Sequence, residues 1–191
     1  RAKYMPIGNY DPRVVANHIV KKAGRPVRQI ALQKLLYFSH GLFLVRHKEP
    51  LVKGSFEAWH YGPVHPAIYQ SFKKYGSNPI SEFAQSKDLR TGEMKPLPEL
   101  EDPEVMRVVD TVLHAFGDLT DGQLVDLSHA PAGPWDVIKQ RAKNERMVGL
   151  RISNELIAQR FGKHKLSTCT LTSSGDVYDG KDAPIAYHGF G

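Results

Sequence analysis

Apolar residues recur at intervals of three and four along most of the chain, which is the spacing that places them on one face of an α-helix. Val15, Ile19 and Ala23 form the first such face. Between residues 28 and 46 the same spacing continues through a longer stretch, with a polar position at Lys34. The pattern therefore predicts two helices early in the chain, the second longer than the first.

Helix starts and stops are also readable. Several apolar stretches are preceded by a side chain that can accept hydrogen bonds from the free amides of a first turn. These capping residues are Asp11, Asp102, Thr120 and Ser153. Glycines follow several of the stretches and indicate where the helices end. The expected helices cover about 12–23, 28–46, 66–75, 103–116, 121–129, 134–141 and 154–161.

Strands are predicted to be few. The segment 54–59 is short, aromatic and bounded by turn residues, which favours an extended strand that Gly62 and Pro63 break. Residues 77–101 are expected to form a loop, with a further short strand near 80–83. The prediction is a mainly α protein: a compact single domain of about seven helices with one or two short β-strands.

Domain boundaries follow from the same pattern. The domain is expected at residues 10–162, after an N-terminal extension at 1–9. From 163 to 191 the composition turns to Ser, Thr, Gly and Asp, which is typical of a flexible or loosely docked C-terminal tail. A length of 191 residues fits one domain of this kind.

Charge and cysteine content limit the classes of protein to which the chain can belong. The chain has a net charge of +6 and a pI near 9.4, and most of the positive excess lies before residue 96. This asymmetry suits an acidic partner or a phosphate backbone, although packing of the two halves and a solvated surface explain it equally well. The single Cys169 excludes an internal disulfide and a thiolate zinc cluster. No apolar run is long enough for a membrane helix and no secretory signal is present, so we expect a cytoplasmic protein.

Catalytic and metal chemistry find little support. His60 and His65 are separated by Gly62-Pro63, which rules out helical spacing, and Glu57 is the sole nearby carboxylate. Hydrogen-bonded imidazoles that brace a turn are the favoured interpretation. Ser128-His129 are adjacent in sequence, so on a helix their side chains point in different directions. We therefore predict no enzyme activity, no metal and no cofactor.

Aromatic residues cluster between Tyr37 and Phe72. Most of these rings are expected in the core, because large aromatic side chains dominate burial. The Trp-His-Tyr-Gly-Pro turn that starts at Trp59 combines a fixed backbone with rings that carry polar tips, a composition also suited to a rigid contact surface.

Five ordered blocks carry a family resemblance. They are LQKLLYFSHG at 32–41, PL at 50–51, FEAWHYGPVHPAIYQSFKKYG at 56–76, LVDLSHAPAGPW at 124–135 and ISNELI at 152–157. Together they resemble the Panacea domain of SocA-like antitoxins and phage-associated GepA-type proteins. Two mild departures are Arg28 and Ser128, where the family often has Thr.

The resemblance implies an antitoxin of a bacterial or phage type II system that binds and neutralises a protein toxin encoded in the same operon. An alternative that it also implies is a proteolytic adaptor that delivers the toxin to a AAA+ protease such as ClpXP. A nucleic-acid-binding regulator is the third hypothesis. Many members of the family that the chain resembles carry an additional DNA-binding domain, whereas only about ten residues precede the first helix here. Operator binding by this chain alone is therefore not expected. We expect contact with the toxin through the turn at 59–65 and through exposed positions of the second helix. The candidate contact residues are Lys34, His40, Trp59, His60, Tyr61, Val64, His65 and Tyr69.

Overall fold

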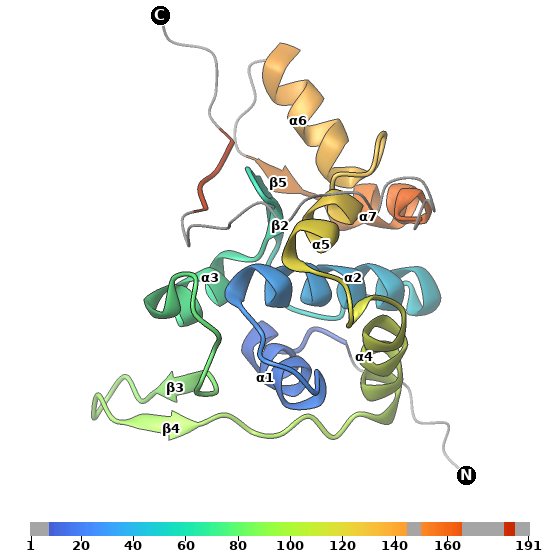
Figure 1. The fold of residues 1–191 in the computed structure, drawn as a ribbon. Helices are drawn as coiled ribbons and strands as arrows, with labels where there is room; N and C mark the ends of the chain where they lie inside the picture. The colour runs from blue at the N-terminus through green and yellow to red at the C-terminus, as the bar shows by residue number, and fades with distance from the viewer. Residues whose placement is uncertain (1–7, 145–149, 166–181, 186–191) are drawn as a thin grey trace, which may run out of the picture.

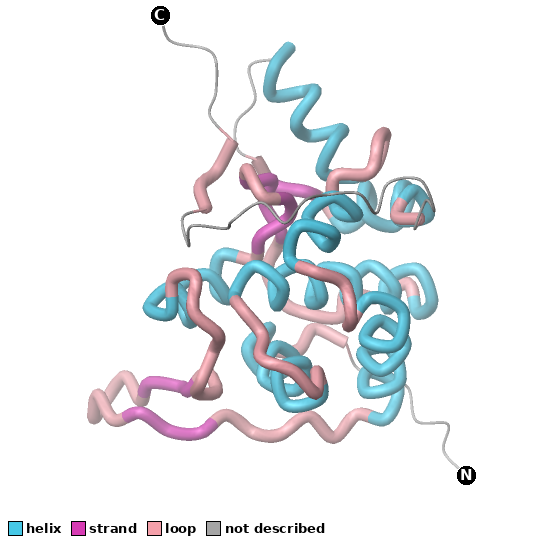
Figure 2. Tube along the Cα trace, in the orientation of Figure 1, coloured by secondary structure: helices cyan, strands magenta, loops and turns pink. Residues whose placement is uncertain are grey.

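The computed structural model describes residues 8–144, 150–165 and 182–185. Within these residues it contains seven α-helices and five short strands (Figures 1 and 2). The helices are α1 (Pro12–Lys22), α2 (Gln29–His47), α3 (Pro66–Phe72), α4 (Pro103–Phe116), α5 (Asp121–Ser128), α6 (Pro134–Asn144) and α7 (Asn154–Arg160). The strands are β1 (Phe56–Trp59), β2 (Gly62–Val64), β3 (Gln85–Lys87), β4 (Met94–Pro96) and β5 (Arg151–Ile152). Single 3-10 turns, η1 (Lys73–Tyr75) and η2 (Phe161–Lys163), extend α3 and α7. The mainly α prediction is confirmed, with more strands than expected.

The predicted helix caps form. Asp11 accepts from the Arg13 amide at the start of α1, and the Asp102 carboxylate accepts from two amides of the first turn of α4. Thr120 and Gln123 form a reciprocal capping box at α5. At α7 the Ser153 side chain accepts from the Leu156 amide. These starts are local chemistry, which explains why the sequence alone locates them.

Helix α2 runs through the centre of the molecule (Figure 1). It contacts α1, α3, α4, α5, α7 and β2, so that nearly all of its length is buried. The expectation that Lys34 and His40 lie on an exposed face of this helix is therefore wrong, since they are 0% and 1% exposed. A helix that is surrounded on every side has no solvent face, and its polar side chains must find partners inside.

A small antiparallel sheet has the order β2-β1-β5. Gly62-Pro63 does not end the extended chain as predicted: after a two-residue turn these residues return as β2, with Trp59 opposite Gly62. On its other side β1 pairs with β5, where Phe56 lies opposite Ile152. The hairpin of β1 and β2 packs against α2, α5 and α6.

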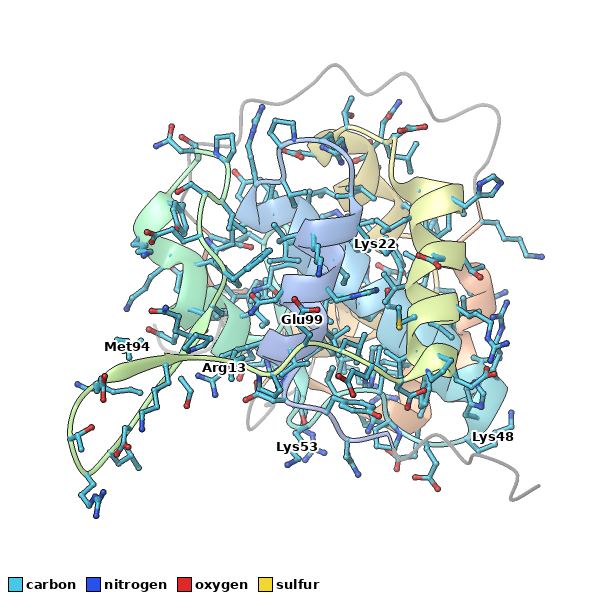
Figure 3. All side chains as sticks on the ribbon, turned by 90° about the horizontal axis from the view of Figure 1, so that it is seen from below. Arg13, Lys22, Lys48, Lys53, Met94 and Glu99 are labelled. Carbon is cyan, nitrogen blue, oxygen red and sulfur yellow. The ribbon has the colours of Figure 1, made fainter. Side chains whose placement is uncertain are left out.

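A second hairpin, β3–β4, projects from the body as an arm (Figure 1). The strand predicted near 80–83 is wrong, because the extended segment starts two residues later, at Gln85. The base of the arm is fastened to α1 by Asn17, whose side-chain amide exchanges two hydrogen bonds with the Ala84 backbone. At the tip, Leu89 is 96% exposed. From below, the chain can be followed out of the arm, from Met94 to Glu99, across α1 (Figure 3).

The predicted tail divides in the structure. His164 is buried: its Nε2 lies 2.8 Å from the Tyr37 hydroxyl, and its Nδ1 donates to the Leu127 carbonyl at 2.9 Å. Residues 182–185 lie along β1. The predictions for 166–181 and 186–191, for Cys169 and for most of the N-terminal extension fall outside the described residues. Among the described helices, none is both long and apolar enough to cross a membrane.

Candidate functional site

The turn between β1 and β2 consists of His60 and Tyr61 and reaches the surface. His60 is exposed, Tyr61 is half-buried, and Trp59 lies buried beneath them. Tyr61 packs against Ile30 and Val125, which fixes the turn to α2 and α5. The turn therefore reaches the surface through His60, and Tyr61 anchors it to the body.

The other candidates lie at different depths. Tyr69 is half-buried and packs its ring against Trp59 at 4.9 Å. Val64, His65, Lys34 and His40 are buried, so they support the surface from beneath. The exposed part of the predicted site is thus His60, with portions of Tyr61 and Tyr69.

His65 braces the hairpin, as the sequence predicts. Its Nε2 donates to the Lys53 carbonyl at 2.8 Å, and its backbone amide donates to the Gln33 side chain at 2.8 Å. Burial lowers the pKa of His65, although the hydrogen bond to the Lys53 carbonyl opposes the shift. A neutral imidazole is therefore part of the scaffold.

His40 has a comparable structural role. The Val52 amide donates to its Nδ1 at 3.4 Å, so the ring proton resides on Nε2, which faces the Asn154 side-chain oxygen at 2.9 Å. Burial lowers the pKa of His40 to about 4, against the opposing effect of this second bond. Within the described residues, no three His, Cys, Asp or Glu side chains gather closely enough to hold a metal ion.

Lys34 is the least expected group of the site. It leaves α2 and donates from Nζ to the Pro63 carbonyl at 3.1 Å, directly under the turn. Burial lowers its pKa to about 8, while the negative charge of Asp182 acts in the opposite direction. A lysine ammonium thus lies in the interior, close behind the surface formed by the turn.

Gly62 allows this close packing. Its φ of +99° belongs to the left-handed region, and a Cβ there would lie 2.3 Å from the Ser128 hydroxyl and 2.8 Å from Cε of Lys34. Only glycine fits between α2, α5 and the turn. The Ser128 hydroxyl donates to the backbone carbonyl of Val125 at 2.7 Å, one turn earlier in α5.

A stack of side chains continues the surface onto α6. The Trp135 indole donates to the Trp59 carbonyl at 2.8 Å, and the His129 ring lies parallel to Trp135 at 3.6 Å. Lys139 places its ammonium over the same indole, 4.8 Å from the ring centre. Burial, followed by the charges of Lys34 and Lys139, lowers the pKa of His129 to about 3. The periodicity argument missed this stack, although the block LVDLSHAPAGPW contains most of it.

Residues 182–185 complete the site, although the sequence indicated nothing there beyond a tail. The His60 amide donates to the Ala183 carbonyl at 2.9 Å, and Trp59 pairs with Pro184 across an antiparallel bridge. The Tyr61 amide donates to the Asp182 carboxylate at 3.3 Å. Burial raises the pKa of Asp182, while the Lys34 charge opposes the rise.

A groove of about 1070 Å³ lies elsewhere, between α1, α3 and the β3–β4 arm. His18 lines it with an Nε2 that has no hydrogen-bond partner among the described residues. None of the predicted contact residues lines this groove. The hairpin turn and the groove are therefore separate features.

Comparisons with known proteins agree with the ordered blocks. Residues 32–136 match the family described as "Antitoxin SocA-like, Panacea domain". The chain is 40% identical over 172 residues to "Antitoxin SocA" of Caulobacter vibrioides, an alignment that covers 88% of this chain and 92% of the relative. None of the solved structures matches. The residues matched by the family model include most of α2, the β1–β2 hairpin, α5 and the start of α6, which form most of the site. On this evidence the chain belongs to the SocA-like antitoxin family and carries its Panacea domain.

Proposed function

We propose that this protein is an antitoxin of a type II system that binds a protein toxin encoded beside it and neutralises it by direct contact. The observation that carries the proposal is the 40% identity to Antitoxin SocA over nearly the whole of both chains. The alignment covers 88% of this chain and 92% of the relative, which supports a shared scaffold.

The geometry favours binding over catalysis. Near the turn, His40 and His65 are buried and fixed by hydrogen bonds, and His129 is half-buried and stacked on Trp135. Loss of solvent lowers the pKa of each. Such groups stabilise a rigid surface and are poorly placed to exchange protons with a substrate. We therefore assign them to the support of a contact surface.

The proposed contact surface is the turn His60–Tyr61 with Tyr69 and Lys139 beside it. Rigid aromatic groups next to a positive charge are the kinds of residue that dominate protein–protein interfaces. Because the backbone here is fixed by Gly62 and by the Trp135 hydrogen bond, little conformational entropy is lost on binding.

Co-expression with the neighbouring gene tests the proposal. The neighbouring gene should arrest growth alone, growth should recover with this protein, and the two products should co-purify. A harmless neighbour, or one that does not co-purify, would refute the assignment.

Charge-reversal variants locate the surface. His60→Glu and Lys139→Glu should weaken binding, whereas the matched control Lys22→Glu, at the exposed end of α1, should not. Leu89→Asp at the tip of the arm provides a second site. If Leu89→Asp alone abolished binding, the contact surface would lie on the arm, and the turn would be excluded.

The half-life of the toxin separates steric neutralisation from delivery to a protease. Plain occlusion leaves it unchanged or longer in cells that contain the antitoxin. A half-life that becomes shorter would support a proteolytic adaptor in place of the mechanism proposed here.

A further inference from the structure

The outer edge of β1 is covered by two segments that lie end to end. The Ala58 amide donates to the Leu150 carbonyl beside β5, and the Ala58 carbonyl accepts from the Ile185 amide at 3.3 Å. Because the amide and carbonyl of one residue in an antiparallel strand point to the same side, both partners lie on the same edge. The second half of this edge is thus covered by residues 182–185.

The cover over this second half is slight. Among the described residues it includes one backbone bond to Ala58, one from His60 and the contact of the Asp182 carboxylate with the Tyr61 amide. Ala183 and Pro184 are exposed, and Ile185 is half-buried against the core. A segment held by backbone bonds and one carboxylate contact can be exchanged for another extended segment that offers the same groups.

Charge selects what the edge accepts. Lys34 is buried, and among the described residues its ammonium donates to the Pro63 carbonyl. Asp182 is the acidic group whose charge favours the ammonium form of Lys34. The same Asp182 carboxylate accepts from the Tyr61 and Ala183 amides, so it occupies a defined position at the end of the edge. An extended segment without a carboxylate there would leave the interior ammonium uncompensated.

A free strand edge is also a liability, because its unpaired amides and carbonyls recruit other chains. Covering the edge with a segment of the same chain removes this liability while no partner is bound. The cover is then a substitute for the partner, with the backbone groups and the charge that the partner would supply.

We propose that the edge formed by Ala58, His60 and Tyr61 is a strand-docking site for an extended, carboxylate-bearing segment of the toxin, and that Asp182–Ile185 is a self-ligand which the toxin displaces. This inference rests on the proposed antitoxin function. It adds the chemistry of the partner segment and a competition between that segment and the protein's own chain.

The first experiment needs no toxin. Ile185→Pro removes the amide that bonds to the Ala58 carbonyl. Asp182→Asn removes the negative charge that favours the Lys34 ammonium while it keeps an acceptor for the Tyr61 amide. Both tryptophans of the chain lie at the site, so their two indole N–H signals in full-length ¹⁵N-labelled protein report on docking. Both variants should shift the Trp59 signal and accelerate hydrogen exchange of the His60 amide. Asp126→Asn, at an exposed carboxylate of α5, is the matched control and should do neither.

A peptide then tests the edge directly. The probe is a synthetic peptide with the sequence of residues 180–187, GKDAPIAY, added in excess to the Ile185→Pro protein. It should return the Trp59 signal toward its wild-type position, and a peptide with Asn for the Asp should not. If the peptide leaves the Ile185→Pro spectrum unchanged, or binds wild type equally well, the strand-docking site is refuted. A concentration-dependent dimer would assign the edge to a second copy and refute it as well.

The toxin provides the second readout. Because a docked self-ligand reduces the competent fraction of the protein, Ile185→Pro should bind the co-expressed toxin several-fold more tightly than wild type does. The His60 amide should be protected from exchange in the complex of either protein. Equal affinities with an unprotected His60 amide would refute the self-ligand and leave the antitoxin assignment intact. Failure of both proteins to bind would instead refute the assignment itself.

Discussion

The indole of Trp135 donates a hydrogen bond to the backbone carbonyl of Trp59, across the boundary between α6 and the β1–β2 hairpin. The bond joins the stack to the turn, so that the contact surface is held as one unit. Because both groups are buried, the bond should contribute measurably to the free energy of unfolding.

Loss of this bond should destabilise the protein without changing its helix content. Trp135→Phe keeps a ring against His129 but leaves the Trp59 carbonyl without its donor. An unsatisfied buried acceptor costs about 1–3 kcal/mol of unfolding free energy, which urea titration can measure. Lys139→Gln is the control, because it removes the cation above the indole but leaves the bond. A cost for Trp135→Phe no larger than that of the control would contradict this account.

Lys34 should make stability rise in alkaline solution. Its folded pKa of about 8 lies below the ordinary value of 10.5, so the unfolded chain binds the proton more tightly. Stability should therefore increase as the pH rises from about 8 to 10.5, by about 3 kcal/mol, and Lys34→Met should lack this increase. The measurement is the difference in unfolding free energy between the two proteins at pH 7.5 and pH 10.5. Lys22→Met, at an exposed position, controls for the loss of one positive charge, and parallel pH profiles for wild type and Lys34→Met would exclude a buried ammonium.

The histidines should make the unfolding free energy fall in acid. The pKa values of His40 and His129 are lowered to about 4 and about 3, so the unfolded chain protonates first when the pH falls below 6.5. For His40 the native state should lose about 1.4 kcal/mol per pH unit between 6.5 and 4. Imidazole NMR titration of the folded protein checks the two pKa values. Titration of either ring near pH 6.5 would show that it is accessible and not part of the scaffold.

Gly62→Ala should be among the most damaging single-methyl changes in the chain. The new Cβ would meet Ser128 and Lys34 at distances that real contacts do not reach, in addition to the strain of a positive φ. Overpacking and strain together should cost more than ~3 kcal/mol.

Gly92→Ala is the matched control for this substitution. Its φ is +74°, yet the nearest atom to a Cβ there lies at 4.0 Å, so the cost of the control reports the backbone alone and should be about 1 kcal/mol. Equal costs at the two positions would mean that the close approach at Gly62 is unimportant.

Local chemistry explains what the sequence could predict. Asp11, Thr120 and Ser153 bond within their own first turns, so neighbouring residues suffice to place the helix starts. The turn at the tip of the arm also depends on neighbouring residues, since the Asp88 carboxylate accepts from the Arg90 amide. The two strands of the arm could not be predicted, because they are exposed and polar and show no alternation of apolar and polar residues.

Features that depend on the tertiary environment could not be predicted from the sequence. Lys34 occupies a polar position in a helical pattern, and only the packing of α5 and the hairpin around α2 shows that this position is interior. Asp182 is 148 residues away from Lys34 in sequence, in a segment with tail-like composition. No spacing rule relates two such residues, so the influence of the Asp182 charge on Lys34 could be found only from the coordinates.

The central position of α2 affects how the protein unfolds and is degraded, as well as how it folds. Its neighbours come from both ends of the domain, α1 before it and α7 far after it. Removal of either end uncovers apolar residues of a helix that has no solvent-compatible side. The domain should therefore unfold in one cooperative transition, with no half that survives alone. Proteolytic cleavage near either end would therefore unfold the whole molecule and lead to its degradation. Local damage is then enough to remove the antitoxin.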